Sequence, residues 1–160
     1  MSVREAPEEV QRVDQPPPGA VTGVVALLLD PGPPRWWAMI LRVATAAIFL
    51  PTGLGKFLNH DAYVARFERW GFGEAAGEVA ILVGVAEVAC GLMLLVGLAP
   101  RAAALVLAGN MIGALATAGR VDGGQDVWLP LLLIAVLAAI AVGGGGRWAP
   151  ARIRLSDRAR

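Results

Sequence analysis

Three polar side chains lie inside apolar stretches of this sequence, where they have the chemistry to form a buried charge cluster: Arg42, Glu87 and Asn110. A charge at bilayer depth costs about 2.5 to 3.5 kcal/mol on insertion scales, so it needs a partner or a role. A guanidinium, a carboxylate and a carboxamide can pair with one another. A desolvated carboxylate can also carry a proton or bind a ligand.

The expected depths of these residues favour contact. At a rise of about 1.5 Å per residue, Glu87 sits about 15 Å below the outer end of its apolar segment, and Arg42 about 9 Å above the inner end of its own. In a core of about 30 Å their heights then differ by about 6 Å, within reach of an arginine. We expect a cluster of Arg42, Glu87 and Asn110, which either fixes helix packing or makes Glu87 a functional group.

A second pairing is expected at the membrane surface. Lys56 closes one apolar segment and Glu78 opens the next at almost the same height. They form either a rim ion pair or, for Lys56, a lysine that reaches water alone. Small residues mark close packing: Gly84 and Gly91 share a helical face with Glu87, and Gly109 with Gly113 forms a GxxxG. We expect these faces to bring the second and third segments together.

Four apolar segments position these side chains, at roughly residues 36–55, 77–99, 101–118 and 127–145. A helix needs about 20 mostly apolar residues to cross a bilayer. The hydrophobic content of 56% exceeds the roughly 45 to 50% of soluble domains. The sequence therefore predicts an all-α integral membrane protein, an antiparallel four-helix bundle.

The connections add detail. Tyr63, Phe67 and Trp70, spaced i, i+4 and i+7, predict an interfacial amphipathic helix between the first and second spans. The apolar run at residues 20–29 is too short to cross and suits the membrane surface. We expect a proline-rich disordered tail at 1–35, a membrane domain at 36–148 and a basic tail at 149–160. Lys and Arg favour the side of the termini, which predicts both termini in the cytoplasm.

Several classes of site are excluded by composition. Cys90 is the only cysteine and His60 the only histidine. An intramolecular disulfide, a thiol redox couple, an iron–sulfur or cysteine-rich metal site and a haem held by two histidines of this chain are therefore ruled out. The turn holding Asp122 and Asp126 is expected to be solvated rather than a metal loop. A net charge of +1 gives no reason to expect nucleic acid.

Three stretches carry a family resemblance: LRVATAAIFLPTGLGKF at 41–57, VGVAEVACGLMLLVGLAPRAAAL at 83–105 and GGGGRW at 143–148. Over about residues 36–148 the chain resembles the DoxX family and its DoxD-like relatives, four-helix membrane proteins of bacteria. The resemblance implies a place in the bacterial cytoplasmic membrane. It also implies association with oxidoreductases, thiosulfate:quinone chemistry or oxidative-stress complexes. This implication rests on likeness to the family and not on the chemistry of a site.

We therefore expect a non-catalytic membrane subunit or scaffold of a redox complex rather than an enzyme. Its expected partners are the lipid bilayer and a redox enzyme or further copies of the chain, with quinone as a candidate ligand. A small proton-linked transporter or carrier using Glu87 is the first alternative. A quinone-binding oxidoreductase is the second.

Overall fold

The structure is a computed structural model that describes residues 20–29, 36–121, 123 and 127–144. Over these residues all regular secondary structure is helical: α1 (Ala20–Leu29), α2 (Trp36–Leu58), α3 (His60–Phe67), the π-helical turn η1 (Glu68–Phe72), the 3₁₀ turn η2 (Gly73–Ala75), α4 (Ala76–Val96), α5 (Pro100–Val121) and α6 (Trp128–Gly143). Apart from α1, the predicted tails at 1–35 and 149–160 lie outside the described residues, as do Asp122, Asp126 and the end of the GGGGRW stretch.

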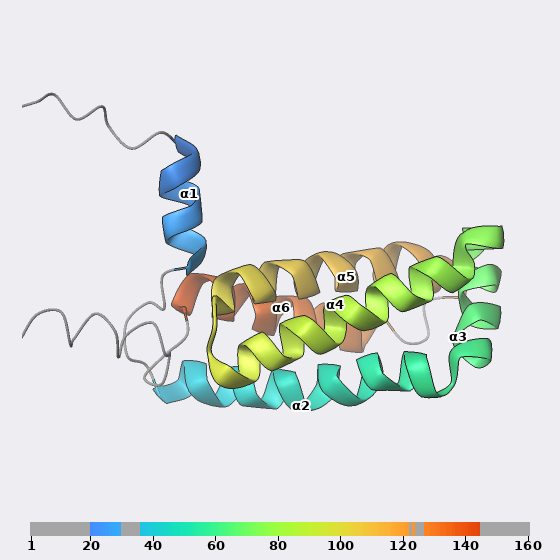
Figure 1. Ribbon diagram of the computed structural model, residues 1–160, viewed down its shortest axis with the longest axis horizontal. Helices are drawn as coiled ribbons and strands as arrows, with labels where there is room; N and C mark the ends of the chain where they lie inside the picture. Colours follow the sequence, from blue (N-terminus) through green and yellow to red (C-terminus); the bar gives the residue numbers. More distant parts are fainter. Residues whose placement is uncertain (1–19, 30–35, 122, 124–126, 145–160) are drawn as a thin grey trace, which may run out of the picture.

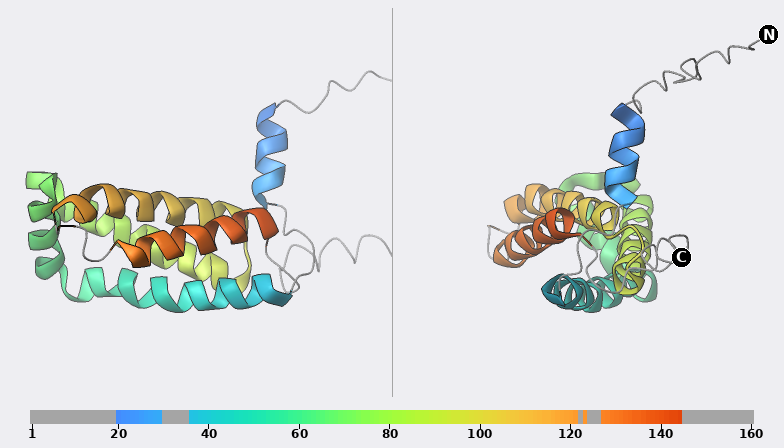
Figure 2. Two further views of the ribbon diagram at one scale, coloured as in Figure 1. Left: turned by 180° about the vertical axis from the view of Figure 1, so that it is seen from behind. Right: turned by 90° about the vertical axis from the view of Figure 1, so that its left-hand side faces the viewer.

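The four long helices α2, α4, α5 and α6 lie side by side along one axis (Figures 1 and 2). At one end α3 crosses the helices, and we call this the α3 end. At the opposite end, the α1 end, α1 projects away from the bundle (Figure 1). There Arg101 Nη1 donates a hydrogen bond to the Leu27 carbonyl oxygen at 3.3 Å, which ties the last turn of α1 to the start of α5.

The bundle is apolar inside and outside. Its core cluster takes buried side chains from each long helix, including Phe49, Leu94, Leu107 and Leu137. Large apolar side chains are also exposed on all four helices: Leu54, Leu82, Leu105 and Leu132. Such a surface is unusual in water and is expected where lipid is the solvent.

The structure contains helices long enough to span a membrane, although it matches the predicted number of four only in part. Among the described residues, three helical segments are long and apolar enough to span a membrane: Trp36–Leu58, His60–Val96 and Pro100–Val121. The fourth, α6, has 16 residues, below the roughly 20 needed for a full crossing. The protein is therefore a membrane protein with several candidate spans, and the fourth crossing remains a prediction.

Glycines bring α2 and α4 together. An added Cβ on Gly84, Gly91 or Gly97 of α4 and its cap would meet Lys56 and Phe57, Leu50 and Arg42, respectively. The numbers rise on α4 as they fall on α2, so these two helices are antiparallel. Gly97, with φ of 76°, also ends α4 in the left-handed conformation that favours glycine. The glycine face of α4 thus receives side chains of α2.

The GxxxG of α5 is placed differently from the sequence prediction. Gly109 and Gly113 are exposed, and an added Cβ on either would meet no atom within 4 Å. These glycines therefore do not form the contact between α4 and α5 that their spacing suggested. The spacing alone does not say which way a face points, because the apolar residues around it allow either orientation in lipid.

This packing predicts opposite effects for two glycine-to-alanine changes. An added Cβ at Gly53 would lie 2.8 Å from Val88 Cγ2 and 3.0 Å from the Val88 backbone nitrogen. Gly53→Ala should therefore destabilise the protein by about 1 to 3 kcal/mol, the usual effect of overpacking. Thermal unfolding in mild detergent measures it.

Gly109→Ala is the matched control, because alanine favours a helix equally there and meets open space. It should leave the unfolding temperature unchanged or raise it slightly. Equal behaviour of the two variants would contradict the close α2–α4 contact.

Candidate functional site

A buried ion pair with an amide partner lies toward the α3 end of the bundle. Lys56 Nζ of α2 lies 2.5 Å from Glu87 Oε2 of α4. Asn110 Nδ2 of α5 donates a hydrogen bond to the other carboxylate oxygen, Oε1, at 2.8 Å. The two charged residues are 7% and 3% exposed. One carboxylate thus has a donor on each oxygen, and three helices contribute to the cluster.

Glycines on both helices let Lys56 reach this position. The stem of Lys56 crosses Gly84, where an added Cβ would lie 3.2 Å from Lys56 Cβ. On the other helix, an added Cβ on Gly53 would lie 3.0 Å from Glu87 Cβ. Residues three apart share a helical face, so Gly53 and Lys56 interlock with Gly84 and Glu87. A side chain at either glycine would push the two charges apart.

The ammonium group of Lys56 is not fully used by this pair. It also donates to the Thr52 carbonyl oxygen at 3.4 Å and lies 5.2 Å from the centre of the Tyr63 ring. A lysine ammonium carries three N–H donors. Two have oxygen acceptors within the described part of the chain, which leaves one for a further acceptor beside Tyr63.

Arg42 lies elsewhere, although its expected height put it within reach of Glu87. Its guanidinium packs against Gly97, where an added Cβ would lie 2.7 Å from Arg42 Nη1. Arg42 precedes Gly53, the neighbour of Glu87, by eleven residues, which is about 16 Å along a helix. The expected heights assumed that the inner ends of α2 and α4 are level. They are not, because α2 begins well beyond the turn between α4 and α5. Arg42, 2% exposed, therefore lies level with that turn.

Glu78 is also separate from Lys56, its expected rim partner. It is exposed in the first turn of α4, and Glu87 lies about 13 Å further along the same helix. Lys56 turns inward to Glu87 rather than outward to the rim. A carboxylate in lipid gains more from a charged partner than a carboxylate in water, because water screens the interaction.

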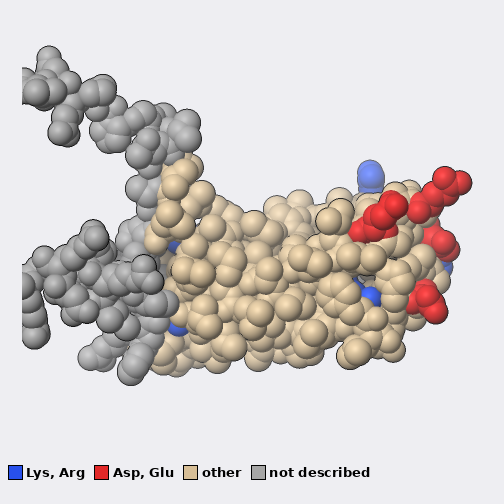
Figure 3. Space-filling model, in the orientation of Figure 1, with Lys and Arg blue, Asp and Glu red and all other residues tan. Residues whose placement is uncertain are grey.

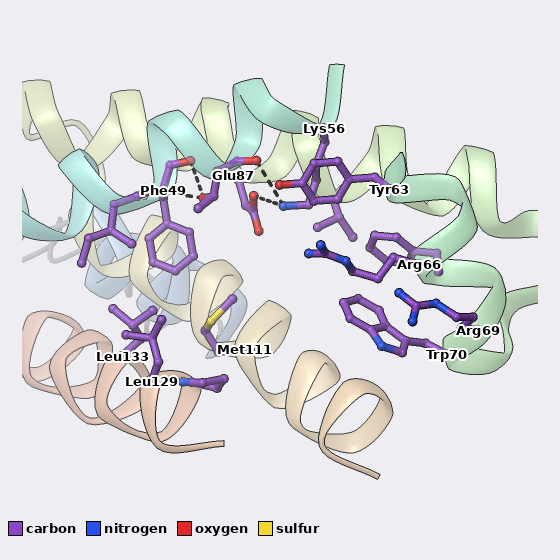
Figure 4. A pocket seen from close by; sticks show the side chains of 15 residues that line it. Phe49, Lys56, Tyr63, Arg66, Arg69, Trp70, Glu87, Met111, Leu129 and Leu133 are labelled. Atoms are coloured by element: carbon purple, nitrogen blue, oxygen red, sulfur yellow. Dashed lines mark hydrogen bonds and ion pairs between the residues drawn. The ribbon is translucent and has the colours of Figure 1, made fainter. Parts of the chain in front are cut away.

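The Lys56–Glu87 pair borders a pocket of about 540 Å³. Figure 4 shows apolar side chains on one side of it and the α3 segment on the other. The apolar wall comes from α2, α5 and α6 and includes Phe49, Met111, Leu129 and Leu133. The edges on α2 and α6 are exposed, with Ile48 at 40% and Leu129 at 41%. The pocket therefore combines a polar floor with an apolar wall that reaches the lipid-facing surface.

The opposite wall is aromatic and cationic, and the sequence did not identify it as part of a site. It consists of Tyr63, Arg66, Phe67, Arg69 and Trp70. Regular helical spacing puts Arg66, three residues after Tyr63, on the aromatic face but puts Arg69, two residues after Phe67, away from it. After Phe67, however, the backbone widens into the π-helical turn of η1 and bends at Gly71, whose φ is 98°. Extra residues per turn rotate Arg69 and Trp70 to the same pocket.

The fold and site define a small helical membrane protein with a buried polar cluster beside a pocket. The DoxX family profile matches residues 37–120, and the chain belongs to the DoxX family. It is also similar to uncharacterized membrane protein Rv3486 of Mycobacterium tuberculosis, with 34% identity over 160 aligned positions that cover 88% of this chain and 96% of the relative. No solved structure matches the chain.

The geometry predicts energetic coupling between Lys56 and Glu87. Removing one partner leaves a buried charge unpaired, at a cost of about 3 to 5 kcal/mol. Lys56→Met and Glu87→Gln should each lower stability in detergent, and the double variant should be markedly more stable than the sum of the two losses implies.

The matched comparison is Arg42→Met with Glu87→Gln. These two changes should add within about 0.5 kcal/mol, because about 16 Å of helix separates the two sites. Coupling of Glu87 to Arg42 rather than to Lys56 would contradict this register of α2 against α4.

Proposed function

We propose that this protein is a non-catalytic membrane subunit of a redox complex and holds a lipid-soluble quinone for a partner enzyme. The observation that carries the proposal is the pocket itself, in which an apolar wall open to lipid faces a buried ion pair. Ligand sites are typically apolar cavities with a few convergent polar groups. Family membership supports the membrane location, and the link to redox enzymes comes from the resemblance.

The residues present fit the head of a quinone. A quinone ring carries two carbonyl oxygens that accept hydrogen bonds. The remaining N–H of Lys56 would donate to one of them, while Phe49, Met111 and Leu133 offer apolar contact to the ring. The exposed edge at Ile48 and Leu129 would let an isoprenoid tail stay in the lipid. Bound quinone accepts electrons and protons, and the electrons would come from the partner enzyme.

The α3 end suits a partner in the aqueous phase. Its acidic side chains, Asp61, Glu68, Glu74 and Glu78, are exposed, and Figure 3 shows them gathered at this end of the molecule. On the positive-inside argument, both termini would lie in the cytoplasm of a bacterial cell and the α3 end would lie outside it. A second copy of the chain is the other partner that the proposal allows.

Quinone retention tests the proposal. Wild-type protein purified in mild detergent from a quinone-containing membrane should carry extractable quinone, quantified by liquid chromatography and mass spectrometry. Lys56→Met/Glu87→Gln should lose it by about tenfold or more, because a hydrogen bond to a charged group is worth about 1.5 to 3 kcal/mol. Glu78→Gln, on the exposed surface of the same helix as Glu87, is the control and should retain quinone. If wild type and both variants are all purified without quinone, the proposal is wrong.

A proton-linked carrier is the second candidate, and the position of Glu87 favours it. Glu87 is 3% exposed yet borders the pocket, as a carboxylate that exchanges a proton with a bound solute would. Purified protein in liposomes with an imposed pH gradient would then release or take up protons when a transported solute is added. Glu87→Gln should abolish that flux, while Glu78→Gln should preserve it. Proton flux that persists in Glu87→Gln would rule out this use of Glu87.

A further inference from the structure

Two arginines at the α3 end have no role in the function proposed above. Arg66 and Arg69 line the pocket wall contributed by α3 and η1. Within the part of the chain that the structure describes, neither forms an ion pair. Arg66 instead lies over the Tyr63 ring, 5.3 Å from its centre. Figure 4 shows both side chains extending toward the pocket.

Within the described lining of the pocket, cationic side chains outnumber carboxylates. Its lining contains three cationic side chains, Lys56, Arg66 and Arg69, and one carboxylate, Glu87. The carboxylate is already paired with Lys56. The exposed acidic residues nearby, Glu68 and Glu74, form no ion pair with either arginine. Among the residues that the structure describes, the arginine side of the pocket therefore carries an excess of positive charge and no carboxylate paired with it.

The surroundings of the arginines indicate the kind of anion that would balance this charge. Half-buried Tyr63 and Trp70 flank them, and such rings favour the headgroup level of a bilayer. The apolar wall opposite, with exposed Ile48 and Leu129, continues onto the lipid-facing surface. A guanidinium presents a planar fork of donors that matches a phosphate. An anion that fits both walls of the pocket would therefore carry an apolar chain of its own.

We propose that Arg66 and Arg69 bind the phosphate of an anionic phospholipid, whose acyl chains lie along the exposed edges of α2 and α6. Basic pockets between membrane helices are a recurring form of headgroup site. The two proposals rest on different polar groups, because the headgroup contacts lie on α3 and η1 and the polar contact of the quinone is Lys56 of α2, although both ligands would extend a chain past Ile48 and Leu129. Loss of one ligand need not remove the other.

Lipid retention measured by native mass spectrometry tests this site. Full-length protein is equilibrated in detergent with equal amounts of phosphatidylglycerol and phosphatidylcholine. Wild type should retain phosphatidylglycerol selectively, and Arg66→Gln/Arg69→Gln should reduce that retention by about tenfold or more, because two basic side chains no longer attract the anionic headgroup. Arg120→Gln is the control, since Arg120 is exposed outside the pocket lining, and it should retain the lipid.

Two further measurements keep the outcomes separate. Unfolding temperature in phosphatidylcholine alone should be the same for wild type and the double variant, which shows that the arginine changes leave the fold intact. Inorganic phosphate and glycerol 1-phosphate should raise the unfolding temperature of wild type less than phosphatidylglycerol does. Equal retention of both lipids by wild type, undiminished retention by the double variant, or full stabilisation by inorganic phosphate alone would each overturn the phospholipid site, whatever the quinone assay shows.

Discussion

The contact between Lys56 and Glu87 sets the architecture of the α3 half of the bundle. A single carboxylate in an apolar medium is strongly unfavourable, and its partner must come from another helix at the same depth. That condition fixes the register of α2 against α4, since a slip of one turn would separate the ammonium from the carboxylate by about 5 Å. Asn110 adds α5 to the same carboxylate at 2.8 Å. Three helices are therefore aligned by one side chain.

The contact between Lys56 and Glu87 requires glycine on the facing helix. The positions of these glycines explain where the polar cluster lies. Lys56 crosses Gly84 and Glu87 lies against Gly53, so the two backbones approach closely enough for short-range pairing. A glycine also makes room for a long cationic side chain at the α1 end, where the Arg42 guanidinium packs against Gly97. In lipid, apolar side chains of neighbouring helices gain little from contact over contact with acyl chains, so close packing and polar pairing decide which faces meet.

The all-helical class, the DoxX family and the contact between Glu87 and Asn110 could be predicted from the sequence, because long apolar segments make an internal polar residue conspicuous. The charged partner of Glu87, which is Lys56, could not be predicted. Depth was inferred from the ends of the apolar segments, which gives Arg42 and Glu87 similar heights only if those ends are level, and α2 extends past the α4–α5 turn. The direction of the Gly109 face and the widened turn after Phe67 were equally hidden, since both depend on tertiary packing rather than on local periodicity.

A purely architectural role would leave the ion pair sealed among apolar side chains, as the Leu94, Leu107 and Leu137 core is sealed. Instead Lys56 and Glu87 border the pocket of about 540 Å³, whose opposite wall presents Arg66 and Arg69. Burying charge beside a cavity costs stability that a close-packed apolar floor would not, and strained or costly features that the rest of a fold supports commonly mark functional sites. The pair holds α2 against α4 and at the same time gives the cavity a polar floor, so its alignment of the helices also positions the groups that would meet the proposed ligand.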